Sequence, residues 1–262
     1  MTSLKRLLSL GAVVGLALAL IPVLANGSGA ATGDASVTIV HGIPSVGAVD
    51  VCADGSVVLV ADVSFKGVAT VSVAPGTYDL TVKAQNATPC TGSTLISLNG
   101  AVIPSGANIS VVAALTGGSP VLDVFTNDVD PVASGSGRVA VYHAANAPAV
   151  DVLVNGGPGL SDIAPGAVKS ADLTADSYDF GVTAAGTTTP VLLDLPGVAV
   201  PAGQLLQVFA VGQPGNADEP FGVITNTVAL TTAPTSTTTP TTAAPTTAAP
   251  ATATNASPSF TG

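Results

Sequence analysis

The sequence predicts an all-β protein made of two tandem antiparallel β-sandwich domains and a disordered C-terminal tail. Three observations support this prediction. Val, Thr, Ala and Gly dominate a chain that has no Trp and only 8% charged residues, a composition that favours short strands joined by Gly and Pro turns. Apolar and polar residues alternate along several short segments, and this pattern occurs twice. The 262 residues leave room for two domains of about 100 residues each.

The duplication begins with two long matching segments. SVTIVHGIPSVGAVDVCADG, from Ser36, aligns with RVAVYHAANAPAVDVLVNG, from Arg138. The match continues to the end of each copy, with the small insertions and deletions that surface turns tolerate. Four equivalent pairs are His41 and His143, Asp50 and Asp151, Asp62 and Asp162, and Asp79 and Asp179. We therefore expect one sandwich over residues 36–128 and another over residues 138–230.

Within each copy, the alternation indicates strands with one buried face. After the turn at Pro75-Gly76, the apolar residues Tyr78, Leu80 and Val82 alternate with polar ones, as expected for a half-buried hairpin strand. The second copy repeats the pattern, so Tyr178 and Phe180 also belong to the predicted core. About seven such strands per copy suit a sandwich of the immunoglobulin or transthyretin type.

The first 25 residues have the features of a secretory signal peptide. Lys5 and Arg6 form its positive region, residues 7–25 are apolar, and Val23-Leu24-Ala25 makes a cleavage site. We expect the exported chain to begin near Asn26. An uncleaved membrane anchor is the alternative, because nineteen apolar residues are long enough to span a bilayer. After cleavage we expect no membrane insertion.

The chain is strongly acidic, with a formal net charge of −10. Loss of the leader removes two of its six basic residues and makes the exported chain more acidic still. Such a surface repels the phosphate backbone of nucleic acid and anionic lipid headgroups. We therefore expect neither as a partner.

Two segments outside the copies are predicted to lack stable structure. Residues 129–137 are mostly small, which predicts a semi-flexible linker that lets the domains reorient. Residues 231–262 are rich in Thr and Pro and carry no charge, so they cannot bury enough apolar surface to fold. Their composition is typical of a glycosylated stalk or a wall-spanning spacer.

The order of these motifs resembles a known family. Each copy has a strand ending in His, a Pro-containing loop, Val-Asp-Val (residues 49–51 and 150–152), Asp-Gly or Asn-Gly, and a later hairpin with Tyr. This order resembles domain of unknown function DUF4397, which occurs as tandem copies in exported bacterial envelope proteins. The resemblance implies a sandwich fold and an extracellular or cell-envelope location. It implies no activity, ligand or catalytic residue.

Cys52 and Cys90 are the only cysteines. In an oxidising compartment, an even number of cysteines is usually paired. We therefore expect one disulfide confined to the first domain, which pins the loop after the hairpin. The second domain has Leu153 at the position of Cys52 and no cysteine, so it has no such bond.

His41 and His143 recur at equivalent positions, which raises the possibility of a metal or catalytic site. His41 follows Val37 and Ile39 on one face of its strand, so a core-edge structural histidine is the preferred interpretation. One His per domain supplies no zinc site of the usual spacing. We expect neither histidine to be needed for binding.

The recurring aspartates likewise have a structural interpretation besides a catalytic one. Asp50 and Asp151 lie between inward-facing valines, so we expect their carboxylates on the outer face or at the rim, solvated or capping a turn. At the domain junction, Asp128 and Asp130 are weak candidates for a calcium site, because calcium binds clustered oxygens. A solvated linker is the preferred interpretation there, and we expect no metal or other cofactor.

The sequence contains no Gly-x-Ser-x-Gly, His-Glu-x-x-His, Walker or Cys-x-x-Cys motif. We therefore expect a non-enzymatic secreted or cell-envelope protein that binds an extracellular or envelope protein or a glycan through its sandwich modules, or displays them. A purely structural wall-spanning spacer is the first alternative, and a hydrolase is the second. An exposed aromatic platform would favour a glycan, but the scarcity of aromatic residues makes such a platform a poor expectation.

Overall fold

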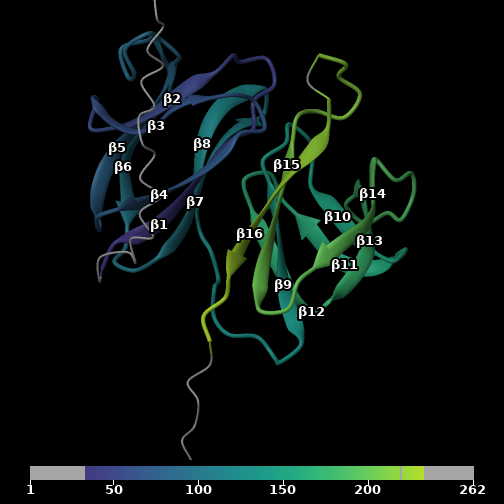
Figure 1. Cartoon of the computed structure of the whole chain (residues 1–262). Coiled ribbons are helices and arrows are strands. Elements are labelled where there is room, and N and C mark those ends of the chain that lie inside the picture. The colour runs from purple at the N-terminus through teal and green to yellow at the C-terminus, as the bar shows by residue number, and fades with distance from the viewer. Residues whose placement is uncertain (1–32, 219, 233–262) are drawn as a thin grey trace, which may run out of the picture.

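The computed structural model of the chain describes residues 33–218 and 220–232 (Figure 1). All secondary-structure elements in these residues are β-strands, so the predicted all-β fold is confirmed. No helix of the described chain has the length and hydropathy that a membrane span needs. The predicted leader at residues 1–25, and all but two residues of the predicted tail at 231–262, lie outside the described residues.

The first domain is a sandwich of two four-stranded sheets, ordered β4-β1-β7-β8 and β3-β2-β5-β6. The described residues of this domain form one strand more than the seven expected. Its strands are β1 (Ala35–His41), β2 (Val49–Ala53), β3 (Val57–Val63), β4 (Val68–Val73), β5 (Gly76–Ala84), β6 (Thr94–Ile103), β7 (Asn108–Thr116) and β8 (Ser119–Thr126).

The second domain repeats this topology strand for strand, in sheets ordered β12-β9-β15-β16 and β11-β10-β13-β14. Its strands are β9 (Ser136–His143), β10 (Val150–Val154), β11 (Gly157–Ile163), β12 (Val168–Thr174), β13 (Asp176–Ala184), β14 (Leu193–Val200), β15 (Gln204–Val211) and β16 (Gly222–Ala229). All pairs are antiparallel except β1 with β7 and β9 with β15, which are parallel.

The turn between the second and third strand of each domain shows how local sequence sets the fold. Asp54 and Gly55 have φ angles of 48° and 81°, and Asn155 and Gly156 have 51° and 75°. Val154 pairs with Gly157 across Asn155 and Gly156, where positive φ at both positions suits a two-residue hairpin turn because its twist matches that of the flanking strands. Ala53 pairs with Val57 across a three-residue turn. Asp-Gly and Asn-Gly adopt these angles more easily than other residue pairs.

Each sandwich encloses its own apolar core. The first is built around Ile39, Val51, Leu80 and Val111, and the second around Val141, Val152, Phe180 and Val208. Tyr78 and Tyr178 pack against these cores and donate their hydroxyls to the carbonyls of Ala74 and Thr174, at 2.9 and 2.8 Å. The core positions predicted for the two tyrosines and Phe180 are confirmed.

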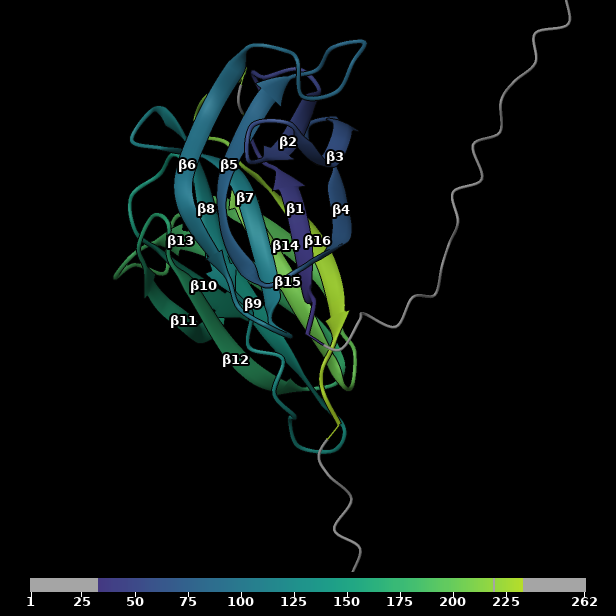
Figure 2. The ribbon, with the colours of Figure 1, turned by 90° about the vertical axis from the view of Figure 1, so that its left-hand side faces the viewer.

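A third core lies between the two domains. It forms where the β4-β1-β7-β8 sheet packs against the β12-β9-β15-β16 sheet, which lie side by side in both views (Figures 1 and 2). Consequently β1, β7, β9 and β15 are buried along almost their whole length, on both faces. The largest buried side chains of this interdomain core are Phe125, Tyr142, Leu205, Phe209 and Ile224.

Within the interdomain core, buried polar side chains form one hydrogen-bonded network. Gln207 Nε2 donates to Ser110 Oγ at 2.9 Å, and Tyr142 Oη donates to Asn127 Oδ1 at 2.7 Å. Asn226 Nδ2 donates to Gln207 Oε1 at 2.8 Å. Burial raises the pKa of Tyr142 to about 12, although its contacts with Gln207 and Ser110 act in the opposite direction. Ser110 and Asn127 belong to the first domain, so the network joins both.

The small linker residues predicted that the two domains can reorient. The structure instead packs the two domains together through the interdomain core. Val129 and Val132 of the linker pack against it. The physical reason is that the central strands are apolar on two faces, and only one face can be covered inside its own sandwich. Burying the second face against the other domain outweighs the freedom that small linker residues would provide.

Candidate functional site

The predicted disulfide between Cys52 and Cys90 is confirmed. Cys52 lies on β2 and Cys90 in the loop after β5, with their Cα atoms 6.0 Å apart. Lys83 Nζ donates to the carbonyls of Cys90 and Gly55, at 2.9 and 3.1 Å. The bond and the lysine together hold this loop over the outer face of the sheet, as expected.

Both histidines are buried at strand ends, as their place in the apolar stripe predicted. His41 is 1% exposed and its Nε2 lies 3.0 Å from the carbonyl of Gly47, while His143 is fully buried with its Nε2 2.8 Å from the carbonyl of Pro148. A carbonyl only accepts, so Nε2 carries the proton in each ring. Each histidine therefore secures the loop that follows its strand.

Asp50 and Asp151 cap backbone groups in the same way in both domains. Asp50 accepts from the N–H groups of Asp62 and Cys90, both at 3.0 Å. Asp151 accepts from Asp162 at 2.6 Å and from Gly186 at 2.8 Å. Solvation and turn capping were the two expected alternatives. Both residues cap backbone groups, and solvation does not apply to Asp50, because this residue is only 1% exposed. The disulfide-bonded loop lies over it.

The capped residues Asp62 and Asp162 need this support because of their backbone. Their φ angles are 56° and 52°, in the left-handed region that side-chain-bearing residues rarely adopt. Each lies where the pairing of β3 with β2, or of β11 with β10, shifts register. A carboxylate that binds the N–H at this bulge stabilises the unfavourable conformation.

Asp79 and Asp179 complete the set of recurring carboxylates. They accept from the N–H groups of Gly100 and Gly197, at 2.9 and 2.7 Å, across from bulges in β6 and β14. Solvation or turn capping was expected for both, and the structure shows the capping alternative. The aspartates that recur in both copies and accept hydrogen bonds therefore stabilise their own domains.

The acidic residues at the junction contact an arginine. Asp128 Oδ1 lies 2.6 Å from Arg138 Nη1, and the Asp130 carbonyl accepts from the same nitrogen at 3.3 Å. Arg138 also makes a bidentate pair with Asp172, at 2.7 and 3.1 Å, which is the main cause of its raised pKa. No group of three or more His, Cys, Asp or Glu in the described residues is placed to hold a metal ion.

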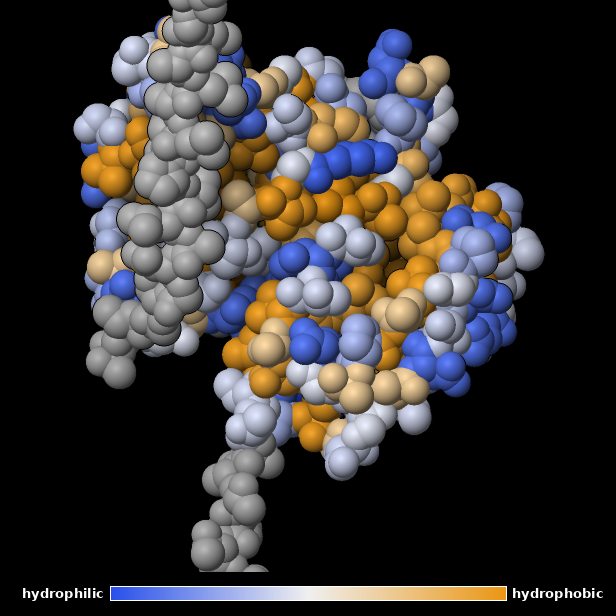
Figure 3. All heavy atoms as spheres, viewed as in Figure 1, coloured by the Kyte–Doolittle hydropathy of each residue, from blue (hydrophilic) through white to orange (hydrophobic). Residues whose placement is uncertain are grey.

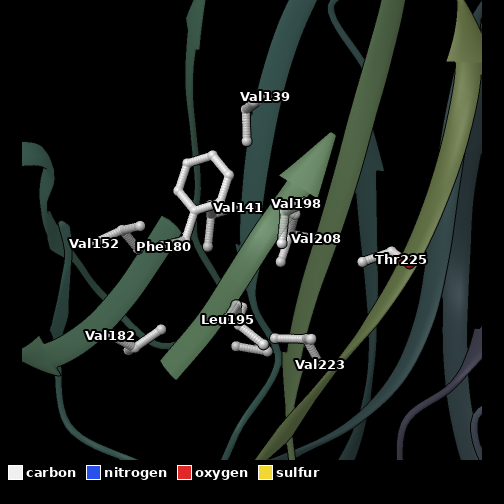
Figure 4. Close-up of a pocket in the computed structure, with 11 residues that line it drawn as sticks. Val139, Val141, Val152, Phe180, Val182, Leu195, Val198, Val208, Val223 and Thr225 are labelled. Carbon is white, nitrogen blue, oxygen red and sulfur yellow. The ribbon is translucent and has the colours of Figure 1, made fainter. Parts of the chain in front are cut away.

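One of the concave features is an apolar hollow in the second domain, at the edge where β14 faces β16. It is a cavity of about 40 Å³ whose walls include Phe180, Leu195, Val198 and Val223 (Figure 4). Figure 3 shows apolar side chains around a recess in this part of the surface. Of the described residues that line it, Thr225 is the only one with a polar side chain. The hollow therefore suits an apolar group and has no side chain for acid–base chemistry.

A second apolar opening lies at the opposite edge of the same sandwich, between β11 and β12. This cleft has a volume of about 400 Å³ and shares Val139, Val141, Val152 and Phe180 with the hollow. Its outer walls include Gly159 and Leu173. Phe180 thus separates two openings into one apolar core.

At some of the corresponding edge positions the first domain has larger side chains, although Leu80 and Ala101 are smaller than their equivalents Phe180 and Val198. Strand register makes Leu122 equivalent to Val223 and Val124 equivalent to Thr225. At the other edge, Leu59 packs against the first core where the second domain has Gly159. A Cβ on Gly159 would lie only 2.6 Å from the Val152 carbonyl. Gly159 and Val223, which are smaller than their equivalents in the first copy, therefore leave space at these two edges.

Sequence reasoning did not identify these openings. The signal that was available is the replacement of Val57-Val58-Leu59 by Gly157-Pro158-Gly159 between the two copies. Because both copies were treated as equivalent, this loss of apolar volume was not interpreted.

Residues 35–153 match the family model described as Domain of unknown function (DUF4397). Two solved structures are similar to the chain. One is the N-terminal domain of AlgF from P. aeruginosa, with 24% identity, 38% of this chain and 100% of that chain covered, and a TM-score of 0.27. The other is the Bacillus anthracis TIE protein, with 12% identity, 68% and 34% covered, and a TM-score of 0.21.

At these TM-scores, neither structure bears on the function of the chain. No curated protein matches it. The matched region runs from the start of β1 through the first domain and the linker to Leu153 of β10. The match over residues 35–153 confirms the family resemblance inferred from the order of the motifs.

Proposed function

We propose that the protein is a non-enzymatic module of the cell envelope or the extracellular space, which binds a protein partner through the second domain. The observation that carries this proposal is the asymmetry between the two sandwiches. The apolar core of the second domain opens at both edges, where Gly159 and Val223 stand in place of Leu59 and Leu122 of the first domain.

The chemistry of the polar residues supports a binding role over catalysis. Asp50, Asp151, Asp79 and Asp179 accept backbone hydrogen bonds, and both histidines are buried against loop carbonyls. A hydrolase needs a general base or nucleophile beside a cleft. The described walls of the hollow and of the cleft contain no titratable side chain.

The lining of the openings favours a protein partner over a glycan. Glycan recognition relies on exposed aromatic rings, and the exposed large apolar side chains of the described chain are all Val or Leu. Phe180 is only 5% exposed. Valine and leucine walls suit the apolar side chains of a partner protein.

Location outside the cell is supported by the disulfide, since such bonds persist in oxidising compartments. The predicted leader and the Thr/Pro-rich tail point the same way. The spacer alternative is supported by the interdomain core, which packs the two domains into one unit.

The proposal is tested by affinity capture from the envelope of the producing cell, with the full exported chain as bait. Leu195→Lys places a charge at the hollow, and Leu98→Lys places the same charge at the equivalent position of the first domain. We expect a specific partner to be lost with Leu195→Lys and kept with Leu98→Lys, in proteins shown by thermal melts to be folded. Equal capture by both variants would exclude the hollow, and capture of nothing by the wild type would favour the spacer.

A further inference from the structure

The cleft between β11 and β12 has a lysine at its mouth. Lys169 of β12 has the same strand parity as Ala171 and Leu173, which line the cleft, so the three side chains leave the strand on one face. Lys169 is exposed, and its Nζ reaches across to β11 and donates to the carbonyl of Ser161 at 2.7 Å. The two strands lie beside each other at the edge of the second domain (Figure 2). The ammonium group therefore lies where the cleft meets the solvent.

This ammonium group is available to an anionic ligand. A lysine carries three N–H donors, and Ser161 is the one acceptor that the described residues offer it. Arg138 and Lys169 are the only basic residues in the segment 138–230. Because Arg138 is held in ion pairs with Asp128 and Asp172, Lys169 is the cation that this domain can present to a ligand.

The space behind Lys169 is apolar. The cleft has a volume of about 400 Å³, and none of the described residues that line it has a polar side chain. Small-molecule sites usually have volumes of about 300–1,000 Å³. A methylene group is close in size to a water molecule, which takes up about 30 Å³, so the cleft has room for a chain of roughly a dozen such groups. An apolar cleft with one cation at its mouth fits an amphiphile with one alkyl chain and an anionic head.

The first domain has neither feature at the equivalent positions. Ala69 pairs with Ile39 as Lys169 pairs with Val141, so Ala69 stands in place of the lysine. Leu59 stands in place of Gly159, which lines the cleft. The cation and the space beside it therefore occur together in one copy, as expected for two parts of one site.

We propose that this cleft binds a free fatty acid, with the alkyl chain between the two sheets and the carboxylate hydrogen-bonded to Lys169 Nζ. Hydrogen bonds between two charged groups are the strong ones, and burial of each methylene group adds to the affinity. The site lies at the opposite edge of the sandwich from the hollow, so this inference does not rest on the proposed protein partner.

The charge of the chain favours a free fatty acid over a membrane surface. With a net charge of −10, the protein repels an anionic bilayer, whose many headgroups act together. A single carboxylate needs only one cation, and Lys169 supplies it. A neutral or cationic amphiphile with the same chain gains nothing from this lysine.

The test is isothermal titration of the full exported chain with laurate, kept below the concentration at which laurate forms micelles. We expect one laurate to bind per chain. From octanoate to laurate, each added methylene group should tighten binding about fourfold, and the gain should stop once the cleft is full. Dodecanol and dodecyltrimethylammonium should bind at least about tenfold more weakly than laurate, because neither offers a negative charge to the lysine.

Four variants locate the ligand. Lys169→Met removes the charge and keeps a long unbranched side chain, and should weaken laurate binding at least about tenfold while leaving dodecanol binding nearly unchanged. Lys66→Met, at an exposed lysine of the first domain, changes the net charge equally and should leave laurate binding unchanged. Ala171→Phe fills the cleft and should abolish binding of both ligands, and Ala171→Val, which copies the first domain, should weaken both.

Thermal melts establish that each variant is folded. A wild-type protein that does not bind laurate overturns the proposal, and so does one that binds dodecanol equally tightly. Equal losses with Lys66→Met and Lys169→Met, or laurate binding that survives Ala171→Phe, would also overturn it. Vesicles of phosphatidylglycerol should not bind, and vesicle binding that is lost with Lys169→Met would assign the cleft to a membrane lipid instead.

Leu195→Lys separates this inference from the proposed function. The substitution alters the hollow at the other edge, so it should abolish capture of the protein partner and leave laurate binding intact. Laurate binding that is lost with Leu195→Lys and kept with Lys169→Met would place the ligand in the hollow and overturn the proposal.

Discussion

The two domains share one topology and one set of polar caps, yet they differ in how their cores are closed. The first has a disulfide over its outer sheet and Leu59, Leu122 and Val124 at its edges. The second has Leu153 in place of Cys52 and apolar openings at both edges. Duplication has therefore left two different surfaces on a common scaffold.

This comparison depends first on whether the two domains unfold as one unit. Phe209 is fully buried in the interdomain core, where its ring stacks on Tyr142 with centroids 4.5 Å apart. Phe209→Ala should lower the free energy of unfolding by about 3–5 kcal/mol. Calorimetry should show one transition in the wild type and two in the variant, because the contact that couples the domains is weakened.

The control for this prediction is Phe180→Ala, which removes a ring of the same size from the inner core of the second domain. It should destabilise the protein while leaving the domains coupled. Two separate transitions in the wild-type protein would show that the interdomain core does not unite them.

The disulfide allows a second comparison between the domains. Reduction, or replacement of both cysteines by serine, should destabilise the first domain by about 4 kcal/mol, since the bond closes a loop of 38 residues in the unfolded chain. Hydrogen exchange should accelerate in residues 85–92 and stay unchanged in residues 185–192. An equal acceleration in both loops would mean that the disulfide acts on the whole protein.

Asp50 and Asp151 occupy equivalent positions and both accept backbone hydrogen bonds. Comparing them tests whether burial increases the contribution of such a carboxylate to stability. Asp50 is buried under the disulfide-bonded loop, whereas Asp151 is half-buried. Removing one partner of a buried hydrogen bond costs about 1–3 kcal/mol, so Asp50→Asn should lower stability by that amount and Asp151→Asn by less. Urea unfolding of the two variants measures this difference, and equal losses would contradict the role of the covering loop.

The hollow can be altered by exchanging residues between the copies. Val223→Leu restores the side chain of Leu122 and should stabilise the second domain by up to about 0.8 kcal/mol, the value of one buried methylene group. Leu122→Val should cost the first domain a similar amount or more. Thermal melts of both variants test this reciprocity, and a destabilised Val223→Leu would mean that the hollow has no room for a larger side chain.

The smallest expected effect concerns Asp123, which occupies the position of the buried Ile224 in the second domain. Burial raises the pKa of Asp123, and its Oδ2 has no hydrogen-bond partner among the described residues. The folded state therefore holds this proton more tightly than the unfolded chain, and the ionised form costs stability as pH rises above 3.8.

Asp123→Asn should accordingly raise the melting temperature slightly at neutral pH. The gain should disappear below pH 3.8, where the wild-type carboxyl is protonated in both states. Melts across this pH range check the prediction. A gain that is independent of pH would indicate that the amide stabilises through a new hydrogen bond.

Much of the fold could be predicted because its causes are local. Alternation around Tyr78 and Leu80 indicated a strand with one buried face. The hairpin predicted at Pro75-Gly76 was wrong, because β4 and β5, which this turn joins, lie in different sheets. The strand face shared by His41 and Ile39 predicted a buried histidine, and the two cysteines had only each other as partners. Each inference required only neighbouring residues or a count.

The unpredicted features depend on residues far apart in the chain. Arg138 forms ion pairs with both Asp128 and Asp172, so two segments 44 residues apart must meet at it. No sequence motif predicts this contact. The solvated position predicted for Asp50 was wrong because strand parity gives the face of a residue and not what covers that face. The openings of the second domain arise from volumes summed over several strands.

The sequence by itself determined the duplication, the strand faces, the turns, the disulfide and the family resemblance, because each is encoded in spacing or composition. The tertiary structure decided the rest. The unbroken apolar runs of β7 and β15 show that both faces of these strands are buried, but only packing of one sheet on the other shows what covers the second face. Apolar contact has no preferred direction or partner, so it is settled by the shapes of whole domains.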